Sequence, residues 1–181
     1  MNPNLKKEYY CMKKRILICI SVLLVAICII GFFTIKSFKI VGYDGLIAKA
    51  RKEINLAEAD TIEMVIAGKS TINSNTHLFW FVTGNEYQMN RPHSIEFIEL
   101  ENNEYEFAHR YNPIPRGQDI YVLPWHGGYS FFVNNPKCKT IRIDDYADTK
   151  DVEVTEYPFI YYNKLSPREY LFLDENGNEI K

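Results

Sequence analysis

Residues 16–35 carry no charged side chain, and this run restricts the possible folds of the chain more than any other feature. Fourteen of its twenty residues are Ile, Leu, Val or Phe. A helix rises about 1.5 Å per residue, so twenty residues cross the roughly 30 Å hydrocarbon core of a bilayer. The run therefore predicts a transmembrane helix over 16–35 that contacts the lipid bilayer.

A cleaved export signal is the alternative interpretation of this run. Such a signal has a shorter apolar region, followed by small residues at the cleavage site. Here the run ends in FFTIK, without an A-x-A pattern. We therefore expect an uncleaved anchor.

Basic residues on either side of the run predict its orientation. Five precede it and three lie within fifteen residues after it. They are Lys6, Lys7, Lys13, Lys14 and Arg15 before the run, and Lys36, Lys39 and Lys49 after it. An excess of Lys and Arg marks the cytoplasmic side. We expect a cytoplasmic tail over 1–15 and an extracytoplasmic C-terminal part, as in a single-pass cell-membrane protein.

Charge divides at the same place. Residues 1–39 contain seven Lys or Arg and one acid, a net charge of +6, whereas residues 40–181 contain fourteen Lys or Arg and twenty-two Asp or Glu, a net charge of −8. An acidic domain repels phosphate backbones, which argues against nucleic acid as a partner.

A short amphipathic helix is expected in the segment 36–59, which otherwise forms a stalk. Asp44 is a candidate N-cap for it. Apolar residues recur at helical spacing and form one stripe, made up of Leu46, Ile47, Ala50 and Ile54.

From residue 60 onward the apolar period shortens to two, which is typical of strands. Three hairpins are expected, at 93–111, at 119–133 with a turn at His126-Gly127-Gly128, and at 169–180 with a turn at Asn176-Gly177. With eight to ten strands, the sequence predicts a mainly β fold. Residues 60–181 would form one extracytoplasmic domain, an antiparallel β-sandwich or a strongly bent β-sheet.

Three segments of this domain, NNPKCKTIRI, VEVTEYPFIYY and YLFLDENGNEI, carry a resemblance to known proteins. The chain resembles small exported or membrane-anchored β-domain proteins of Gram-positive bacteria, for which no activity is assigned. The resemblance covers residues 60–181. It implies an envelope location and an all-β core, and it assigns no catalytic residue.

The sequence predicts no cofactor and no metal. Gly68-Lys69-Ser70 lacks the first glycine of a P-loop, and the acidic DENGNE segment has its glycine at the wrong position for an EF-hand. No two of the four histidines are spaced to bind zinc from one face of an element. Cys138 is the only cysteine after residue 35, so the domain contains no internal disulfide.

We therefore expect a non-catalytic envelope module that binds a protein or a polysaccharide, with a small envelope hydrolase as the alternative and a sensor as a third possibility. The stiff loop 112–119, which contains two prolines, and the turn region 125–129 are the candidate contact surfaces. Their candidate residues are Arg116, Gln118, Asp119, Trp125, His126 and Tyr129. The aromatic residues of the domain either fill the core or form a binding platform.

The predicted topology can be tested by labelling intact cells with a membrane-impermeant thiol reagent. Cys138 should react, after mild unfolding if it is buried, because it lies in the exported part. Cys11 should stay unlabelled until the membrane is opened. The opposite pattern would show that the orientation is inverted.

Overall fold

The computed structural model describes residues 40–54, 63–84 and 91–180, together with Ile20, Ser21, Leu23 and Val25. Ile40–Lys181 forms a compact unit of its own. The predicted anchor 16–35 lies outside the described residues, apart from those four, which are helical. None of the described helices has both the length and the hydropathy that a membrane crossing requires.

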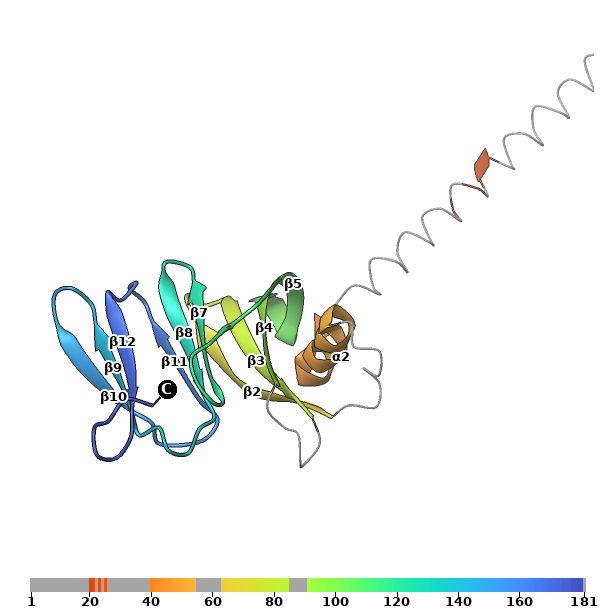
Figure 1. Cartoon of the computed structure of the whole chain (residues 1–181). Coiled ribbons are helices and arrows are strands. Elements are labelled where there is room, and N and C mark those ends of the chain that lie inside the picture. Colours follow the sequence, from red (N-terminus) through yellow and green to blue (C-terminus); the bar gives the residue numbers. More distant parts are fainter. Residues whose placement is uncertain are drawn as a thin grey trace, which may run out of the picture. The chain divides into compact units, whose positions relative to one another are not determined.

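The described part of the unit is mainly β, and its strands pair antiparallel in three sheets (Figure 1). Sheet A has the order β1-β5-β4-β3-β2 and consists of β1 (Ile40–Val41), β2 (Met64–Thr71), β3 (Thr76–Thr83), β4 (Arg91–Glu99) and β5 (Glu104–Tyr111). Sheet B has the order β11-β8-β7-β6 and consists of β6 (Ile114–Pro115), β7 (Ile120–Trp125), β8 (Gly128–Val133) and β11 (Phe159–Asn163). Sheet C has the order β10-β9-β12 and consists of β9 (Thr140–Asp144), β10 (Thr149–Glu153) and β12 (Glu169–Leu173).

Within this unit the elements stack in four layers: helix α2 (Gly42–Ile54), sheet A, sheet B and sheet C (Figure 1). A separate apolar cluster fills each of the three gaps. Sheets A and B therefore bury side chains on both faces. On β3, for example, Phe79 faces α2 and Trp80 faces sheet B.

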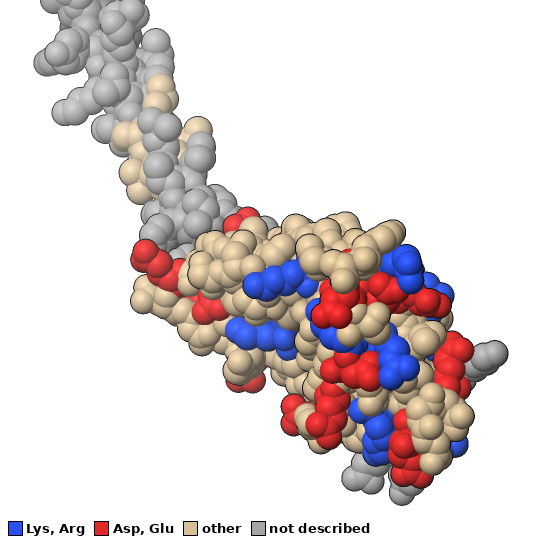
Figure 2. All heavy atoms as spheres, turned by 90° about the vertical axis from the view of Figure 1, so that its left-hand side faces the viewer, with Lys and Arg blue, Asp and Glu red and all other residues tan. Residues whose placement is uncertain are grey.

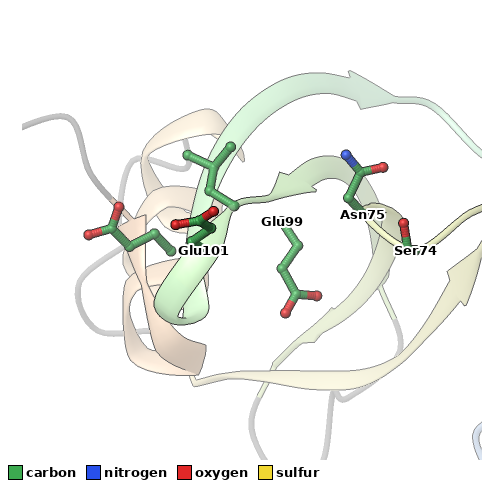
Figure 3. A pocket seen from close by; sticks show the side chains of 6 residues that line it. Ser74, Asn75, Glu99 and Glu101 are labelled. Carbon is green, nitrogen blue, oxygen red and sulfur yellow. The ribbon is translucent and has the colours of Figure 1, made fainter.

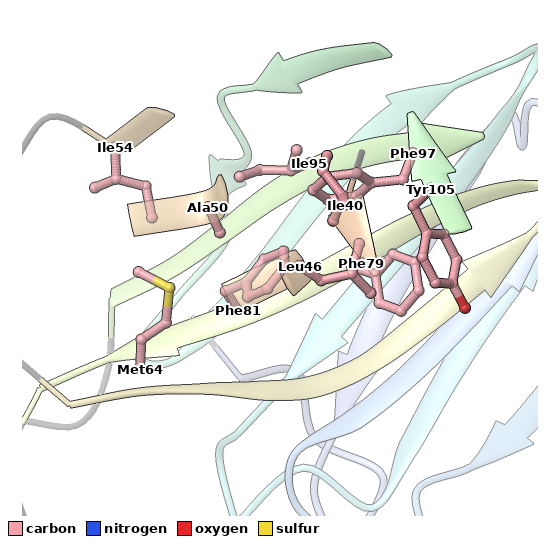
Figure 4. Close-up of a cluster of buried hydrophobic side chains, with 10 residues drawn as sticks. All are labelled: Ile40, Leu46, Ala50, Ile54, Met64, Phe79, Phe81, Ile95, Phe97 and Tyr105. Carbon is pink, nitrogen blue, oxygen red and sulfur yellow. The ribbon is translucent and has the colours of Figure 1, made fainter. Parts of the chain in front are cut away.

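The first gap explains the position of α2. Leu46, Ala50 and Ile54 form the buried stripe of the helix, as the sequence predicted. They pack on the aromatic face of sheet A around Phe79 and Phe81 (Figure 4). Burying a side chain of the size of Leu or Phe contributes about 1.5–3 kcal/mol, so this face fixes the helix on the sheet.

The start of α2 differs from the prediction. The helix begins at Gly42, so Asp44 lies in its first turn rather than at the N-cap. A carboxylate in that turn still favours the helix, because it interacts with the positive end of the helix dipole.

The hairpin of β7 and β8 confirms the predicted turn. Trp125 pairs with Gly128, which leaves His126 and Gly127 as a two-residue loop. Both residues have positive φ, 44° and 76°, as in a type I′ turn. The short strand β6 pairs with β7 only at Tyr121 and Val122, so β6 does not reach Pro124. The missing N–H of Pro124 therefore removes no hydrogen bond from that ladder.

The other two predicted hairpins are also present, with small differences. β4 and β5 are joined by a single 3-10 turn at Glu101–Asn103. After β12 the chain turns at Asn176-Gly177, but its return limb is a single bridge between Leu173 and Glu179. The loop 112–119 contains the short strand β6, which was not expected.

The outer surface of sheet C is polar. Arg142 forms a two-pronged ion pair with Asp151, and Arg168 pairs with Asp144. Figure 2 views the molecule from this side and shows acidic and basic side chains interspersed. Sheet C therefore closes the stack of layers with a solvated face.

Gly128 offers a stability test with a matched control. A Cβ at Gly128 would lie 2.1 Å from the Asn163 carbonyl oxygen, whereas a Cβ at Gly127 would meet no atom within 4 Å. We expect Gly128→Ala to destabilise the domain by about 3 kcal/mol through overpacking, and Gly127→Ala by only about 1 kcal/mol through its positive φ. Denaturant unfolding of the detergent-solubilised chain, followed by tryptophan fluorescence, measures both. Equal losses would contradict the close approach of β8 and β11.

Candidate binding surface

The two groups of predicted contact residues lie at opposite ends of β7. Arg116, Gln118 and Asp119 precede the strand, and the turn at His126 follows it. Six residues at about 3.3 Å each separate the two ends by roughly 20 Å. The structure therefore presents two small surfaces instead of one.

On the first surface, Arg116 lies over the ring of Tyr170, with its guanidinium carbon 5.6 Å from the ring centroid. Tyr129, from the far end of β8, contacts the same ring at 5.8 Å. Tyr170 thus brings these two predicted residues together. Gln118 and Asp119 are held by their backbone carbonyl oxygens, which accept hydrogen bonds from the Asn135 side chain and the Asn134 amide.

Trp125 lies inside the protein, with 2% of its surface exposed. Trp80 is also buried. The tyrosines that could add to an aromatic platform beside them are half-buried: Tyr129, Tyr157, Tyr161 and Tyr162. Most of this aromatic surface therefore packs between the sheets.

A buried carboxylate that the sequence did not single out organises the second surface. Glu96 projects from β4 into the gap between sheets A and B. Its Oε2 atom accepts hydrogen bonds from Tyr111 Oη at 2.7 Å and Trp125 Nε1 at 2.8 Å. His126 Nε2 lies 3.1 Å from the same oxygen, and 43% of the His126 side chain is exposed.

These bonds determine the charge state of Glu96. Burial alone would raise the pKa of this carboxyl group. The hydrogen bonds from Trp125, Tyr111 and His126 outweigh burial and hold the pKa below its usual value of 4.5. Glu96 therefore stays ionised at neutral pH and ties β4, β5 and the β7–β8 turn together.

Two side chains of a nucleophilic type, Cys138 and Ser130, lie in the core. Cys138 is buried, and burial raises the pKa of its thiol, which disfavours the reactive thiolate. Ser130 Oγ is also buried, 2.8 Å from both Ser70 Oγ and Trp80 Nε1. Both side chains serve packing and hydrogen bonding in the interior.

The four histidines lie in four different environments. His93 contacts Thr83, His109 stacks edge-on against Tyr111, and His126 contacts Glu96, while His77 lies behind Glu99. Burial, together with Arg110 and Arg91, lowers the pKa of His93 to about 4. Among the residues that the structure describes, no three His, Cys, Asp or Glu side chains could hold a metal ion together.

A hollow lined by several carboxylates lies at one end of sheet A (Figure 3). It has a volume of about 550 Å³ and lies between the β2–β3 turn and the β4–β5 turn. In Figure 3, Ser74 and Asn75 stand on one side, Glu101 stands on the other, and Glu99 lies between them. The lining consists of Ser74, Asn75, Glu99, Leu100, Glu101 and Glu104, and we call it the acidic hollow.

Antiparallel pairing brings these two turns together. β2 to β5 run up and down in sequence order, so the β2–β3 and β4–β5 turns fall at the same end of the sheet. The amide of Glu99 donates a hydrogen bond to the Asn75 carbonyl oxygen and joins the two sides. The hollow therefore rests on the sheet itself and not on a long loop.

A buried histidine stands behind Glu99. Only 4% of the His77 side chain is exposed, and Thr71 Oγ1 lies 3.0 Å from its Nδ1 atom. Its Nε2 atom is 2.8 Å from Glu99 Oε2 but outside hydrogen-bond geometry, so it has no hydrogen-bond partner among the described residues. Burial is the main effect that lowers the pKa of His77, and the positive charge of Lys69 lowers it further. Glu99 acts in the opposite direction without reversing the shift. His77 is therefore neutral at pH 7 and does not cancel the charge of Glu99.

Comparisons with known proteins assign no relative to this chain, since no protein-family profile, curated protein or solved structure matches it. The resemblance to exported β-domain proteins stays a prediction from the sequence.

Glu96→Gln tests the role of the buried carboxylate. Hydrogen bonds to a charged group contribute roughly 1.5–3 kcal/mol, so we expect the variant to lose about 2 kcal/mol of unfolding free energy near pH 7. Because the folded pKa is lowered, this stabilisation is complete above the usual carboxyl pKa and disappears as the pH falls through the folded pKa. The difference from the unchanged protein should therefore shrink as the pH falls below the usual carboxyl pKa of 4.5.

Denaturant unfolding across this pH range provides the measurement, with the exposed Glu175→Gln as control. A constant difference at every pH would show that the charge of Glu96 does not matter.

Proposed function

We propose that this protein is a single-pass, membrane-anchored protein of the cell envelope whose β-domain is a non-catalytic binding module. We propose further that its acidic hollow receives a lysine- or arginine-bearing segment of another envelope protein. The observation that carries this proposal is the convergence of three glutamates in one open hollow, backed by a buried, neutral histidine.

The shape of the hollow supports a protein ligand. Glu101 is exposed, Glu104 is half-buried, and Leu100 adds apolar surface between them. A concave site with carboxylates on low-dielectric walls focuses negative potential, which attracts a cationic side chain. The mixed lining favours a peptide that carries both alkyl stems and positive charge over a neutral or anionic polymer.

The net charge of the domain supports the same partner class. Residues 40–181 carry −8, so long-range attraction brings basic partners to the surface. The smaller surfaces at Arg116, Gln118 and Asp119 and at His126 remain predicted contacts. They would add area for a partner larger than one peptide segment.

A small envelope hydrolase is the second candidate, and one observation favours it. Glu96 and His126 form a carboxylate–histidine pair whose imidazole is half-exposed. Such a pair can act as a general base when a nucleophile or a bound water stands next to the imidazole. Among the described residues, Glu96 is the only side chain that hydrogen-bonds to the imidazole of His126, and this favours the binding module.

Binding of a fluorescent oligolysine peptide to the full chain in lipid nanodiscs tests the hollow. We expect the double variant Glu101→Gln/Glu104→Gln to weaken binding about fivefold, since exposed charge pairs contribute roughly 0.2–1 kcal/mol each. The matched control is Glu156→Gln/Glu175→Gln, which removes the same charge from exposed positions elsewhere. Equal weakening in both variants would show that only net charge matters and would refute a specific site.

A further inference from the structure

A second depression lies on the helix-facing side of sheet A, next to the start of α2. It has a volume of about 360 Å³. Aromatic and aliphatic side chains line it together with one cation: Tyr43 and Ile47 of α2, Ile66, Gly68 and Lys69 of β2, and Phe79 of β3. We call this apolar recess with a single positive charge the Lys69 depression.

Strand pairing places the Lys69 depression and the carboxylate of Glu99 on the same face of sheet A. Residues that lie directly opposite each other in an antiparallel ladder point to the same side. Lys69 is opposite Phe79, and Glu99 is opposite Tyr105. Phe79 and Tyr105 both belong to the apolar cluster beneath α2, and their ring centroids are 5.9 Å apart (Figure 4). Lys69 and Glu99 therefore share the face on which α2 packs.

Two buried side chains lie between the acidic hollow and the Lys69 depression. His77 is 2.8 Å from Glu99 in the hollow, and its ring centroid is 6.1 Å from that of Phe79 in the depression. Burial is the main effect that raises the pKa of Tyr105, and Glu99 and Tyr43 raise it further. Tyr105 therefore lies close to one residue from each recess, so the two recesses are neighbours.

The two recesses carry opposite charge. The ammonium group of Lys69 lies 5.7 Å from the centroid of the Phe79 ring, and no carboxylate among the described residues pairs with it. Glu99 lies beside Asn75, four residues along β3 from Phe79 and two strands away from Lys69. At about 3.3 Å per residue and 4.8 Å per strand, Lys69 and Glu99 are roughly 16 Å apart. An extended segment of about five residues covers this distance.

We propose that the segment bound by the acidic hollow is bipolar: its basic residue lies at Glu99, an apolar side chain enters the Lys69 depression, and an acidic residue pairs with Lys69. This inference rests on the proposed function and defines its partner more closely. Alternate side chains of an extended segment point to the same side, so a basic-x-apolar-x-acidic pattern presents all three to this face. Complementary charges at both ends fix the register of the segment.

Fluorescent peptides, titrated with the full chain in lipid nanodiscs, test the acidic end. One peptide is oligolysine followed by Ser-Leu-Ser-Glu, the second has Gln in place of the Glu, and both are also made in reversed order. We expect the preference for Glu over Gln to fall about threefold in Lys69→Gln, as for an exposed charge pair. Lys137→Gln is the matched control, because it removes the same charge from an exposed position before β9.

A second pair of variants tests the apolar contact. Replacing the Leu of the peptide by Ala should weaken binding about fivefold, because a partly buried leucine loses its contact with the recess. Tyr43→Ser should reduce this difference to about twofold, since Tyr43 forms one wall of the recess. Tyr43 is 61% exposed, and Tyr146→Ser is its control at a 77% exposed position in the turn between β9 and β10.

A preference for Glu that falls in Lys69→Gln and not in Lys137→Gln, in either peptide order, supports the proposal. An absent preference, an unchanged one or an equal loss in both variants overturns it. Equal binding of the Leu and Ala peptides also overturns it. A second copy of the chain as occupant would appear as self-association in sedimentation velocity that Lys69→Gln abolishes, and this result overturns the proposal as well.

The variant Glu101→Gln/Glu104→Gln separates this inference from the proposed function. If that variant weakens the binding of oligolysine alone while Lys69→Gln leaves the preference for Glu unchanged, the hollow keeps its basic ligand and only the bipolar segment is refuted. If that variant binds oligolysine as well as the unchanged protein does, the proposed function fails and this inference fails with it.

Discussion

Burial of sheets A and B on both faces is the constraint on which the rest of the structure depends. β3 places Phe79 and Phe81 against α2, and Leu78 and Trp80 against sheet B. A sheet with two apolar faces requires a layer on each side, since exposing either face returns its aromatic side chains to water. Helix α2 and sheet C are therefore necessary parts of the domain. The segment after the predicted anchor is consequently fixed to the domain from Ile40 onward.

The same constraint governs the polar groups of the interior. A polar side chain between two covered sheets must find partners, because an unpaired buried group costs roughly 1–3 kcal/mol. Glu96 meets this requirement through Tyr111, Trp125 and His126, and Ser130 meets it through Ser70 and Trp80. These groups resemble catalytic residues by type. Their partners show that they join the two sheets, and the exposed edge of His126 is the one part that faces solvent.

Local patterns were enough to predict most of the longer elements, but they were not enough to predict their layering. Turn chemistry located the β7–β8 hairpin at His126-Gly127, and apolar spacing located the buried stripe of α2. A period of two predicts one buried face for each strand, whereas on β3 Leu78, Trp80 and Val82 are buried together with the residues between them. An uninterrupted apolar run fits both one-sided and two-sided burial, because only the distant partner layer decides between them.

The candidate sites show the same limit. Glu96 alternates with Ile95 and Phe97, so its pattern suggests a solvated position, and its donors lie 15 to 30 residues away in the sequence. Two other features could have been predicted. The six residues of β7 already separate the loop at Arg116 from the turn at His126. Consecutive antiparallel strands also place alternate turns at one end of a sheet, which is the geometry that forms the acidic hollow.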